Sequence, residues 1–372
     1  MARLGDICSI NMGQSPDSST YNEDGNGLPF FQGNADFGVL HPSVRVWCSA
    51  PTKIAKPNDI LISVRAPIGA LNIADVECCI GRGLAALTVN PDLCTQKYLW
   101  YGLESKVEEL NFKGTGSTFK AISKNTLFDT EIPLPSLAEQ VHIAVVLDKV
   151  SDLIALRKQQ LDKLDELVKA RFVEMFGDPL TNPMKWPKEE LANHIDLLSG
   201  FPFDSSGYVN DGINICGGLT IMPQKIQWEN CKHWESVTGY EDFLLNEGDI
   251  VMALDRPWIS EGFKIARVDA DHLPALLIQR TARIRAIDIN QEFLFCCFIL
   301  GGFEKHCNIT GSLVPHISAK DIRSFEVLFP PLALQAQFAT FTKQVDTYRL
   351  TIQQGLDKLE VLKKALMQQY FG

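Results

Sequence analysis

Two stretches of the chain place apolar residues at the spacing of a long amphipathic helix. In the first stretch no proline or glycine occurs between Pro135 and Gly177. Apolar residues return there at every seventh position, which is typical of the seam of a coiled coil. The seam consists of Leu147, Ile154, Leu161, Val168 and Met175, with Val150 and Leu164 three positions after two of them. The pattern predicts a helix over residues 134–177.

The second helical stretch begins at two adjacent prolines and predicts a helix over residues 329–372. Its apolar series falls on the other core position of the heptad, at Val345, Ile352, Leu359 and Leu366. Because neither seam is complete alone, the two helices are expected to pair. The alternative is that each packs on its own domain. The length favours pairing, since a helix from Leu137 to Met175 would span about 58 Å at 1.5 Å per residue.

The rest of the chain shows short apolar runs bounded by glycine, proline and asparagine, a pattern typical of strands joined by turns. The run from Ile60 to Val64 is one example. Residues 178–187 contain three prolines directly after Gly177 and are expected to form an extended linker that ends the first helix. The pattern therefore predicts two mixed α/β regions and two long helices, an α+β chain.

The chain is an internal repeat, and this is its strongest pattern. With a shift of 195 positions, residues 115–177 align without a gap on residues 310–372, giving 22 identities in 63 positions. The front of each half also matches, at a shift of 187, through Gly13 with Gly200 and residues 17–19 with 204–206. The middle of each half needs insertions. Matched ends around a variable middle indicate two related modules adapted to different targets.

These boundaries predict five segments. The first mixed region covers residues 1–133 and is followed by the first helix over 134–177. The linker covers 178–187, the second mixed region 188–328, and the second helix 329–372.

Composition is that of a globular protein. The 372 residues are 45% hydrophobic and 22% charged, which fits two or three domains. No apolar run approaches the about 20 residues that span a membrane, and the first residues lack the apolar core of a signal peptide. The ten cysteines form no CxxC pair, so we expect reduced core thiols in a cytoplasmic protein. The net charge of −10 leaves room only for a local basic face on an acidic body.

The sequence contains no convincing catalytic or metal-binding motif. Residues 114–118 are rich in glycine but lack the lysine of a nucleotide-binding loop. The seven histidines are scattered, without the spacing of a zinc site. Asp255 and Arg256 with Lys264 could mimic a nuclease centre, but charges at strand ends explain them more simply. We therefore expect no catalytic residue, no metal and no cofactor in this chain.

The repeated motifs resemble one family closely, the specificity subunits of type I restriction-modification enzymes. The resemblance rests on residues 132–140 (IPLPSLAEQ), repeated at 328–335 (LFPPLALQ), and on the linker at 176–187 (FGDPLTNPMKWP). It also includes the opening of each half, LGDI at 4–7 and LANHI at 191–195, and the two Thr-Gly-Ser elements. The second copy departs from the pattern, with Leu334 in place of the acid at Glu139 and Ala192-Asn193 in place of Gly5-Asp6.

The resemblance implies two target recognition domains in a pseudo-twofold arrangement, separated by two long helices that form an antiparallel coiled coil. Each domain would read one half of a bipartite site in double-stranded DNA. Two modification subunits would dock on the chain, bind S-adenosylmethionine and methylate adenine. Two restriction subunits could join them and supply ATP- and Mg-dependent cleavage. The chain itself would be a non-catalytic recognition subunit.

The DNA-binding candidates lie at predicted strand ends and in the repeated Thr-Gly-Ser elements, and most of them are polar. Arginine side chains bind base edges or phosphates, and small hydroxyl side chains contact the DNA backbone. In the first half they are Arg65, Arg82, Thr115, Ser117 and Lys120. In the second half they are Arg256, Trp258, Arg280, Thr310, Ser312 and His316. Trp258 is assigned a wedging or stacking role. Surface salt bridges are the alternative for each arginine.

Two other functions remain open from the sequence. The chain could serve a nuclease of another restriction type, or it could be a coiled-coil assembly scaffold without DNA recognition. A scaffold would show no sequence-selective binding even with its partners.

Overall fold

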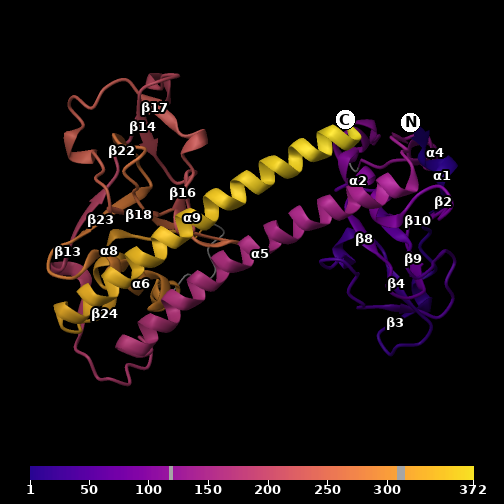
Figure 1. The fold of residues 1–372 in the computed structure, drawn as a ribbon. Coiled ribbons are helices and arrows are strands. Elements are labelled where there is room, and N and C mark those ends of the chain that lie inside the picture. The colour runs from indigo at the N-terminus through magenta and orange to yellow at the C-terminus, as the bar shows by residue number, and fades with distance from the viewer. Residues whose placement is uncertain (117–119, 308–314) are drawn as a thin grey trace. The chain divides into compact units, whose positions relative to one another are not determined.

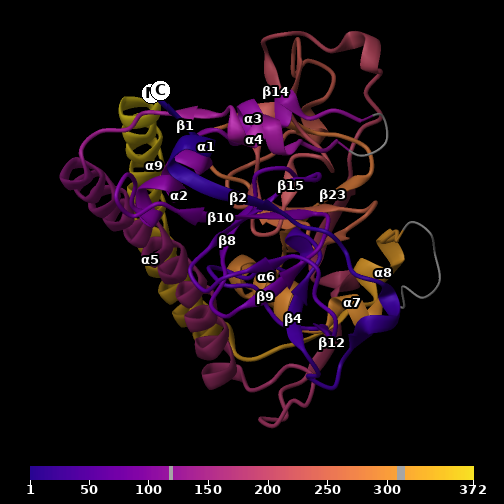
Figure 2. The ribbon, with the colours of Figure 1, turned by 90° about the vertical axis from the view of Figure 1, so that its right-hand side faces the viewer.

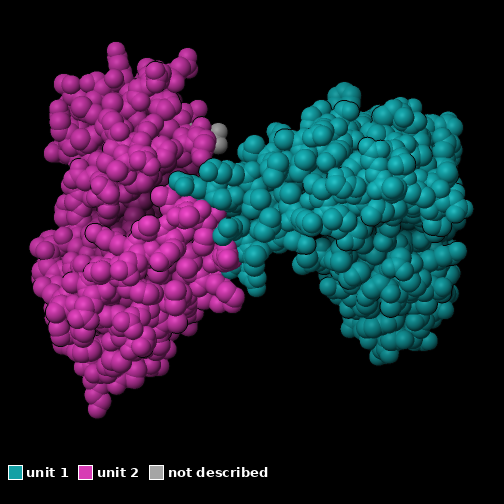
Figure 3. Space-filling model, in the orientation of Figure 1, with its two compact units in different colours: residues 1–159, 353–372 teal, residues 160–352 magenta. Residues whose placement is uncertain are grey.

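The computed structural model describes residues 1–116, 120–307 and 315–372. The chain forms two compact units (Figure 3): unit 1 contains residues 1–159 and 353–372, and unit 2 contains residues 160–352. Each unit combines one mixed α/β region with a part of both long helices. We call residues 1–133 module 1 and residues 188–328 module 2.

In its described residues, module 1 consists of short strands with four short α-helices. The strands are β1 Ala2–Arg3, β2 Cys8–Met12, β3 Tyr21–Asn22, β4 Leu28–Phe31, β5 Trp47–Cys48, β6 Ile54–Ala55, β7 Ile60–Ser63, β8 Leu71–Ile73, β9 Cys78–Ile80, β10 Leu84–Val89 and β11 Glu131–Ile132. The helices are α1 Leu4–Ile7, α2 Gln96–Ser105, α3 Val107–Lys113 and α4 Lys124–Phe128.

Module 2 has the same character. Its strands are β12 Lys188–Glu190, β13 Ile195–Ser199, β14 Ile213–Cys216, β15 Ile221–Met222, β16 Lys225–Ile226, β17 Lys232–Trp234, β18 Ile250–Ala253, β19 Trp258–Ile259, β20 Gly262–Phe263, β21 Ile265–Arg267, β22 Ala275–Leu277, β23 Thr281–Ala286 and β24 Glu326–Leu328. Its helices are α6 Gln291–Leu300, α7 Phe303–His306 and α8 Ala319–Arg323.

The repeat in the sequence is a repeat in topology. Module 1 contains an antiparallel sheet in the order β2-β10-β7-β8, and module 2 contains β13-β23-β18-β21 in the corresponding order. Each module also holds one parallel pair, β4 with β9 and β14 with β22. A short pair of strands, β1–β11 or β12–β24, ties the start of each module to its end.

The core of each unit lies between this sheet and the helix that follows it. In unit 1, α2 packs between the sheet and the start of α5 (Figure 1 and Figure 2). All four residues of β7 are buried, as expected of an apolar run covered on both faces. In unit 2, six residues of α6 are buried, because the helix lies in the centre of an aromatic cluster.

The two long helices are α5, Leu137–Phe176, and α9, Leu332–Phe371. Their predicted heptad positions turn inward. In α5 every core position of the heptad from Leu147 to Met175 is buried or half-buried, including two that hold arginines, Arg157 and Arg171. The same is true of α9, where the polar Thr342 and Arg349 stand on the inward side. The Arg349 guanidinium pairs with Asp165 across the helices at 2.6 Å in unit 2. In unit 1 Lys158 pairs with Glu360 at 3.0 Å.

The last turn of each long helix packs on the module from the other half of the chain. Phe371 of α9 contacts Tyr98 of α2, with ring centroids 5.0 Å apart. Phe176 of α5 contacts Phe293 of α6 at 4.7 Å. These are the same contact twice, because each pair of equivalent residues is 195 positions apart. The helices therefore run antiparallel, and unit 1 includes residues 353–372, which the predicted domain boundaries assign to a separate segment.

Two buried glutamines fix the start of each long helix. Gln140 accepts a hydrogen bond from the backbone amide of Thr95 at 2.9 Å and donates to two backbone carbonyls. Gln335 accepts from the amide of Asn290 at 2.8 Å and donates to the carbonyl of Pro330. A buried carboxamide is stable only when its hydrogen bonds are made, so these residues set the angle at which each helix leaves its module.

The fold class predicted from the sequence is confirmed: two mixed α/β modules and two long antiparallel helices. All ten cysteines are free thiols, and eight of them are buried. Burial raises the pKa of the Cys78 and Cys296 thiols to about 12. Over the described part of the chain, no helix has the length and apolar character needed to cross a membrane.

Candidate nucleic-acid interface

The first candidate surface is a cleft of about 450 Å³ in module 1. Arg65 lies after β7 and Arg82 after β9, so two separate turns bring their exposed side chains to the same cleft. Neither guanidinium forms an ion pair within residues 1–116, 120–307 and 315–372. Both positive charges are therefore available to a ligand. The sequence placed both residues on strand-end turns but did not predict that they line one cleft.

A rigid turn after β4 forms the opposite side of this cleft. The Asp36 carboxylate accepts hydrogen bonds from the backbone amides of Gln32, at 2.7 Å, and Gly33, at 3.3 Å, and it pairs with Arg45. The carbonyl of Gln32 accepts from the amide of Gly83 at 3.1 Å. A Cβ atom on Gly83 would lie 2.4 Å from that oxygen, so only glycine allows the two turns to approach this closely.

The loop that carries the other module 1 candidates runs beside Arg65. Thr115 and Ala121 exchange backbone hydrogen bonds of 3.0 and 2.9 Å, and the carbonyl of Lys120 accepts from the amide of Ala66 at 3.1 Å. The side chains of Thr115 and Lys120 are exposed. Ser117 lies outside the described residues. The structure thus gathers Arg65, Thr115 and Lys120 on adjoining backbone segments.

The second candidate surface, in module 2, is organised by one carboxylate. Asp255 pairs with the Nδ1 atom of His316 at 2.6 Å and with the Nε atom of Arg280 at 3.3 Å. Arg256 follows Asp255 directly and is exposed. The structure therefore brings together three of the candidates predicted in this half. Thr310 and Ser312 lie outside the described residues.

Two of these arginines adopt backbone conformations that side chains rarely take. The φ angle is 46° at Arg256 and 64° at Arg280, in the left-handed region that favours glycine. Both backbones are held by hydrogen bonds: the amide of Arg256 donates to the carbonyl of Pro315 at 3.0 Å, and the carbonyl of Arg280 accepts from Leu254 at 2.9 Å. Such conformations cost free energy and gather at functional sites, which favours a role for both residues.

Trp258 is held in the body of module 2. Its indole stacks on the ring of Phe263, with centroids 4.9 Å apart and planes 14° apart, and it packs against the main core cluster. The side chain is half-buried. The wedging or stacking role that the sequence suggested would use only the exposed part of this ring, and it stays a prediction.

The turns of the two modules correspond residue by residue. Arg65 forms an isolated antiparallel bridge with Ala121, and Asp255 forms one with His316. Ala121 and His316 are 195 positions apart, the shift of the repeat. The equivalent turns therefore carry an arginine in one module and an aspartate in the other.

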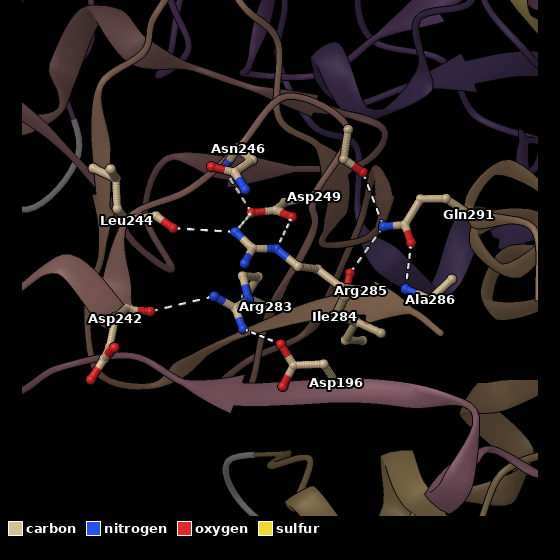
Figure 4. Close-up of polar contacts among 11 residues, drawn as sticks. Asp196, Asp242, Leu244, Asn246, Asp249, Arg283, Ile284, Arg285, Ala286 and Gln291 are labelled. Carbon is tan, nitrogen blue, oxygen red and sulfur yellow. Dashed lines mark hydrogen bonds and ion pairs between the residues drawn. The ribbon is translucent and has the colours of Figure 1, made fainter. Parts of the chain in front are cut away.

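Two further arginines of module 2 are held in ion pairs within the sheet. In β23, Arg283 pairs with Asp196 and donates to the carbonyl of Asp242, and it is buried (Figure 4). Arg285 forms a two-pronged pair with Asp249, at 2.6 and 2.7 Å. These hydrogen bonds to Asp249 raise the pKa of Arg285 above its ordinary value. The two pairs neutralise their own charges and stabilise the sheet.

A second cavity, of about 390 Å³, lies in unit 2 beside the long helices. Its central charge is likewise paired: Arg267 contacts Glu292 and lies 2.9 Å from Asp346. Burial lowers the pKa of Arg267, but the two carboxylates outweigh it and the net shift is upward. The guanidinium also lies over the Phe295 ring at 4.9 Å. The network fastens α9 to module 2, and this is a structural role.

The described residues include no group of three or more histidine, cysteine or acidic side chains that could hold a metal ion. The site residues that the sequence missed are Gln32, Asn34 and Arg45, which line the module 1 cleft. They lie in the variable middle of module 1, where the repeat gives no aligned partner. The only sequence signal for them was the turn at Gly33, directly after an apolar run.

Comparison with known proteins gives a consistent result. Residues 1–166 match a family model described as type I restriction modification DNA specificity domain. A type I restriction enzyme specificity subunit of Methanocaldococcus jannaschii, MjaX, is 42% identical over 160 residues, which are 43% of this chain and 38% of the relative. The MjaVIII specificity subunit of the same organism is 26% identical over 288 residues, 73% of this chain and 68% of that protein. The chain thus spans less than half of the first relative's length.

One solved structure matches the whole chain. It is the S subunit of a type I restriction-modification system from M. genitalium, with a TM-score of 0.61, covering 100% of this chain and 95% of that one. The sequence identity is 16%, so this likeness concerns the fold alone.

Proposed function

We propose that this chain is the sequence-specific DNA-recognition subunit of a type I restriction-modification complex, because residues 1–166 match the DNA specificity domain of such systems. The observation that carries the proposal is the pair of equivalent turns. Each module presents exposed guanidinium groups on or next to the corresponding turns, through Arg65 and Arg82 in module 1 and Arg256 and Arg280 in module 2. On a chain with a net charge of −10, such local basic faces fit the phosphate backbone of DNA.

Each module would read one half of a bipartite site in double-stranded DNA. Arginine side chains at the turns would contact guanine edges or phosphates, since both are acceptors that match the guanidinium fork. Thr115, Lys120 and, with them, Ser117, Thr310 and Ser312 would contact the backbone and set the register. His316 and the exposed part of Trp258 would complete the second surface.

The long helices would act as the spacer between the half-sites and as the scaffold for partners. Two modification subunits would bind the chain and carry S-adenosylmethionine and the chemistry of adenine methylation. Two restriction subunits could join and supply ATP- and Mg-dependent cleavage. The chain itself would bring no catalytic residue and no cofactor, and the complex would act in the cytoplasm.

Sequencing of modified bases tests this function. The chain is expressed with its modification subunit in a host that lacks other adenine methyltransferases, and methylated adenines are mapped. We expect one asymmetric motif made of two short defined parts separated by undefined positions. No motif would contradict DNA recognition and favour a scaffold. Methylation or cleavage by the rigorously purified chain alone would contradict the non-catalytic role.

A further inference from the structure

Two carboxamide side chains, Gln32 and Asn34, line the module 1 cleft together with Arg65 and Arg82. Among the described residues neither carboxamide has a hydrogen-bond partner, although both backbones are bonded. Gln32 is exposed and Asn34 is half-buried. Each side chain therefore offers one donor group and one acceptor atom that the protein does not use.

Other carboxamides of module 1 show the contrast. Asn11 donates to the carbonyl of Ile54 at 2.8 Å, and Asn111 donates to the carbonyl of Ile68 at 2.8 Å. Gln140 of α5, which packs on this module, makes three hydrogen bonds to the backbone. Amides that hold this module together are thus paired with the main chain, and those of Gln32 and Asn34 are left to face the cleft.

The backbone that carries the two amides is fixed before any ligand binds. Asp36 accepts from the amides of Gln32 and Gly33 and is paired with Arg45, and Gly83 bonds the carbonyl of Gln32. A side chain that contacts a base from such a fixed backbone loses less conformational entropy on binding than a side chain on a flexible loop. The stacked rings of Tyr21 and Phe30, 4.7 Å apart, form an apolar wall of the same cleft.

We propose that Gln32 and Asn34 are the specificity-determining residues of module 1 and that they read an adenine in its half-site. The inference rests on the proposed function in DNA recognition. In the major groove a carboxamide matches adenine, because its oxygen accepts from the N6 amino group while its NH₂ group donates to N7. The neighbouring Arg65 and Arg82 then hold phosphates or an adjacent guanine.

The corresponding turn of module 2 supports the assignment to one half-site. It follows β14 and runs over residues 217–220, which are two glycines, Leu219 and Thr220, with no carboxamide. Leu219 is fully exposed. An apolar side chain contacts a thymine methyl group but cannot bond adenine. The base preference that depends on Gln32 and Asn34 therefore belongs to module 1 alone.

Selection from a randomised duplex DNA library tests the inference. The probe is incubated with the complex of the full chain and its modification subunits, and bound sequences are compared for the native chain, Gln32→Ala, Asn34→Ala and the double variant. We expect the preference for adenine at one position of one half-site to fall about 5- to 150-fold. Gln32→Glu should move the preference toward cytosine, whose N4 amino group donates to a carboxylate.

The matched control is Asn125→Ala, an exposed carboxamide on α4 that does not line the cleft. It should leave every base preference unchanged, and thermal unfolding should be the same for all variants. Unchanged preferences in the double variant, or a uniform loss of affinity for all sequences, would overturn the inference. A native complex that selects no sequence would instead contradict the proposed function.

Discussion

Modules 1 and 2 share one strand order but place different side chains at the equivalent turn. Module 1 has Arg65 there, without an ion pair among the described residues, and module 2 has Asp255, which holds Arg280 and His316. The scaffold therefore determines where a side chain is presented, and the residue at that place determines the charge. One fold can in this way present two different patterns of charge.

The interiors of the two sheets differ as well. In β10 the residues equivalent to Arg283 and Arg285 are Ala86 and Thr88, as the strand registers show. Asp59 and Asp249 are buried at the same turn and accept the same backbone hydrogen bond, 2.8 Å in each module. Only Asp249 also binds an arginine. Module 2 thus depends on internal ion pairs where module 1 has small side chains.

A change in the long helices tests whether the two modules read independently, and it has the largest expected effect. Seven residues are inserted after Glu166 and seven after Tyr348; because the helices are antiparallel, both insertions fall on the module 2 side of the Asp165–Arg349 pair. A whole heptad keeps the seam in phase and adds about 10.5 Å, about three base pairs at 3.4 Å each. Methylation sequencing should show the same half-sites with a spacer longer by about three base pairs.

The control is the same insertion in α5 alone. It should abolish methylation, because the core positions of α5 no longer lie opposite those of α9. An unchanged spacer with full activity in the double insertion would show that the helices do not set the distance between the half-sites.

Replacing the equivalent aspartates, Asp59 and Asp249, tests how much the internal ion pair contributes to the stability of module 2. Asp249→Ala should lower the free energy of unfolding of module 2 by about 3 kcal/mol, because it leaves Arg285 without its partner and also removes a turn cap. Asp59→Ala should lower that of module 1 by about 1 kcal/mol, the effect of the cap alone. Hydrogen exchange in β18 and β7 measures each module separately. Equal losses would mean that the Arg285 pair contributes nothing.

Replacing one surface arginine in each module tests whether the two modules differ in the charge they offer to DNA. Arg82→Ala should reduce the salt dependence of binding to non-specific duplex DNA by about one released counterion. Arg280→Ala should reduce it less, since Asp255 already offsets that charge. The measurement is a titration at several salt concentrations. Asp255→Asn is the reciprocal change and should steepen the salt dependence; equal slopes for both arginine variants would refute the distinction.

The smallest difference between the two modules is expected in the reactivity of their buried thiols, because both modules bury cysteines in the same way. With a pKa of about 12, Cys78 and Cys296 would be about one part in ten thousand thiolate at pH 8, the form that reacts. Alkylation of the folded chain should therefore be slow at both residues and should rise about tenfold for each pH unit. Mass spectrometry of labelled peptides measures it. Fast labelling at pH 8 would show that one module opens.

The sequence predicted the helices, the two modules and the core thiols because those features depend on local periodicity and on the repeat. The cleft needed the structure, because Gln32 and Arg82 are far apart in the sequence and meet through the pairing of β4 with β9. The same limit applies to arginine. Nothing local distinguishes Arg283, which is buried against Asp196, from Arg82, which is exposed, because the partner lies elsewhere in the chain.

The last turn of each long helix packs on the module from the other half of the chain, and this affects the order in which the chain folds during synthesis. The core of unit 1 contains Phe371 of α9, packed on Tyr98 of α2, more than 250 residues earlier in the sequence. At roughly 5–20 residues per second, the ribosome needs roughly 10–40 s to add residues 160–372. Through that interval the module made first exposes the apolar site that Phe371 later fills. The first half of the chain thus reaches its final core only after residue 371 has been made.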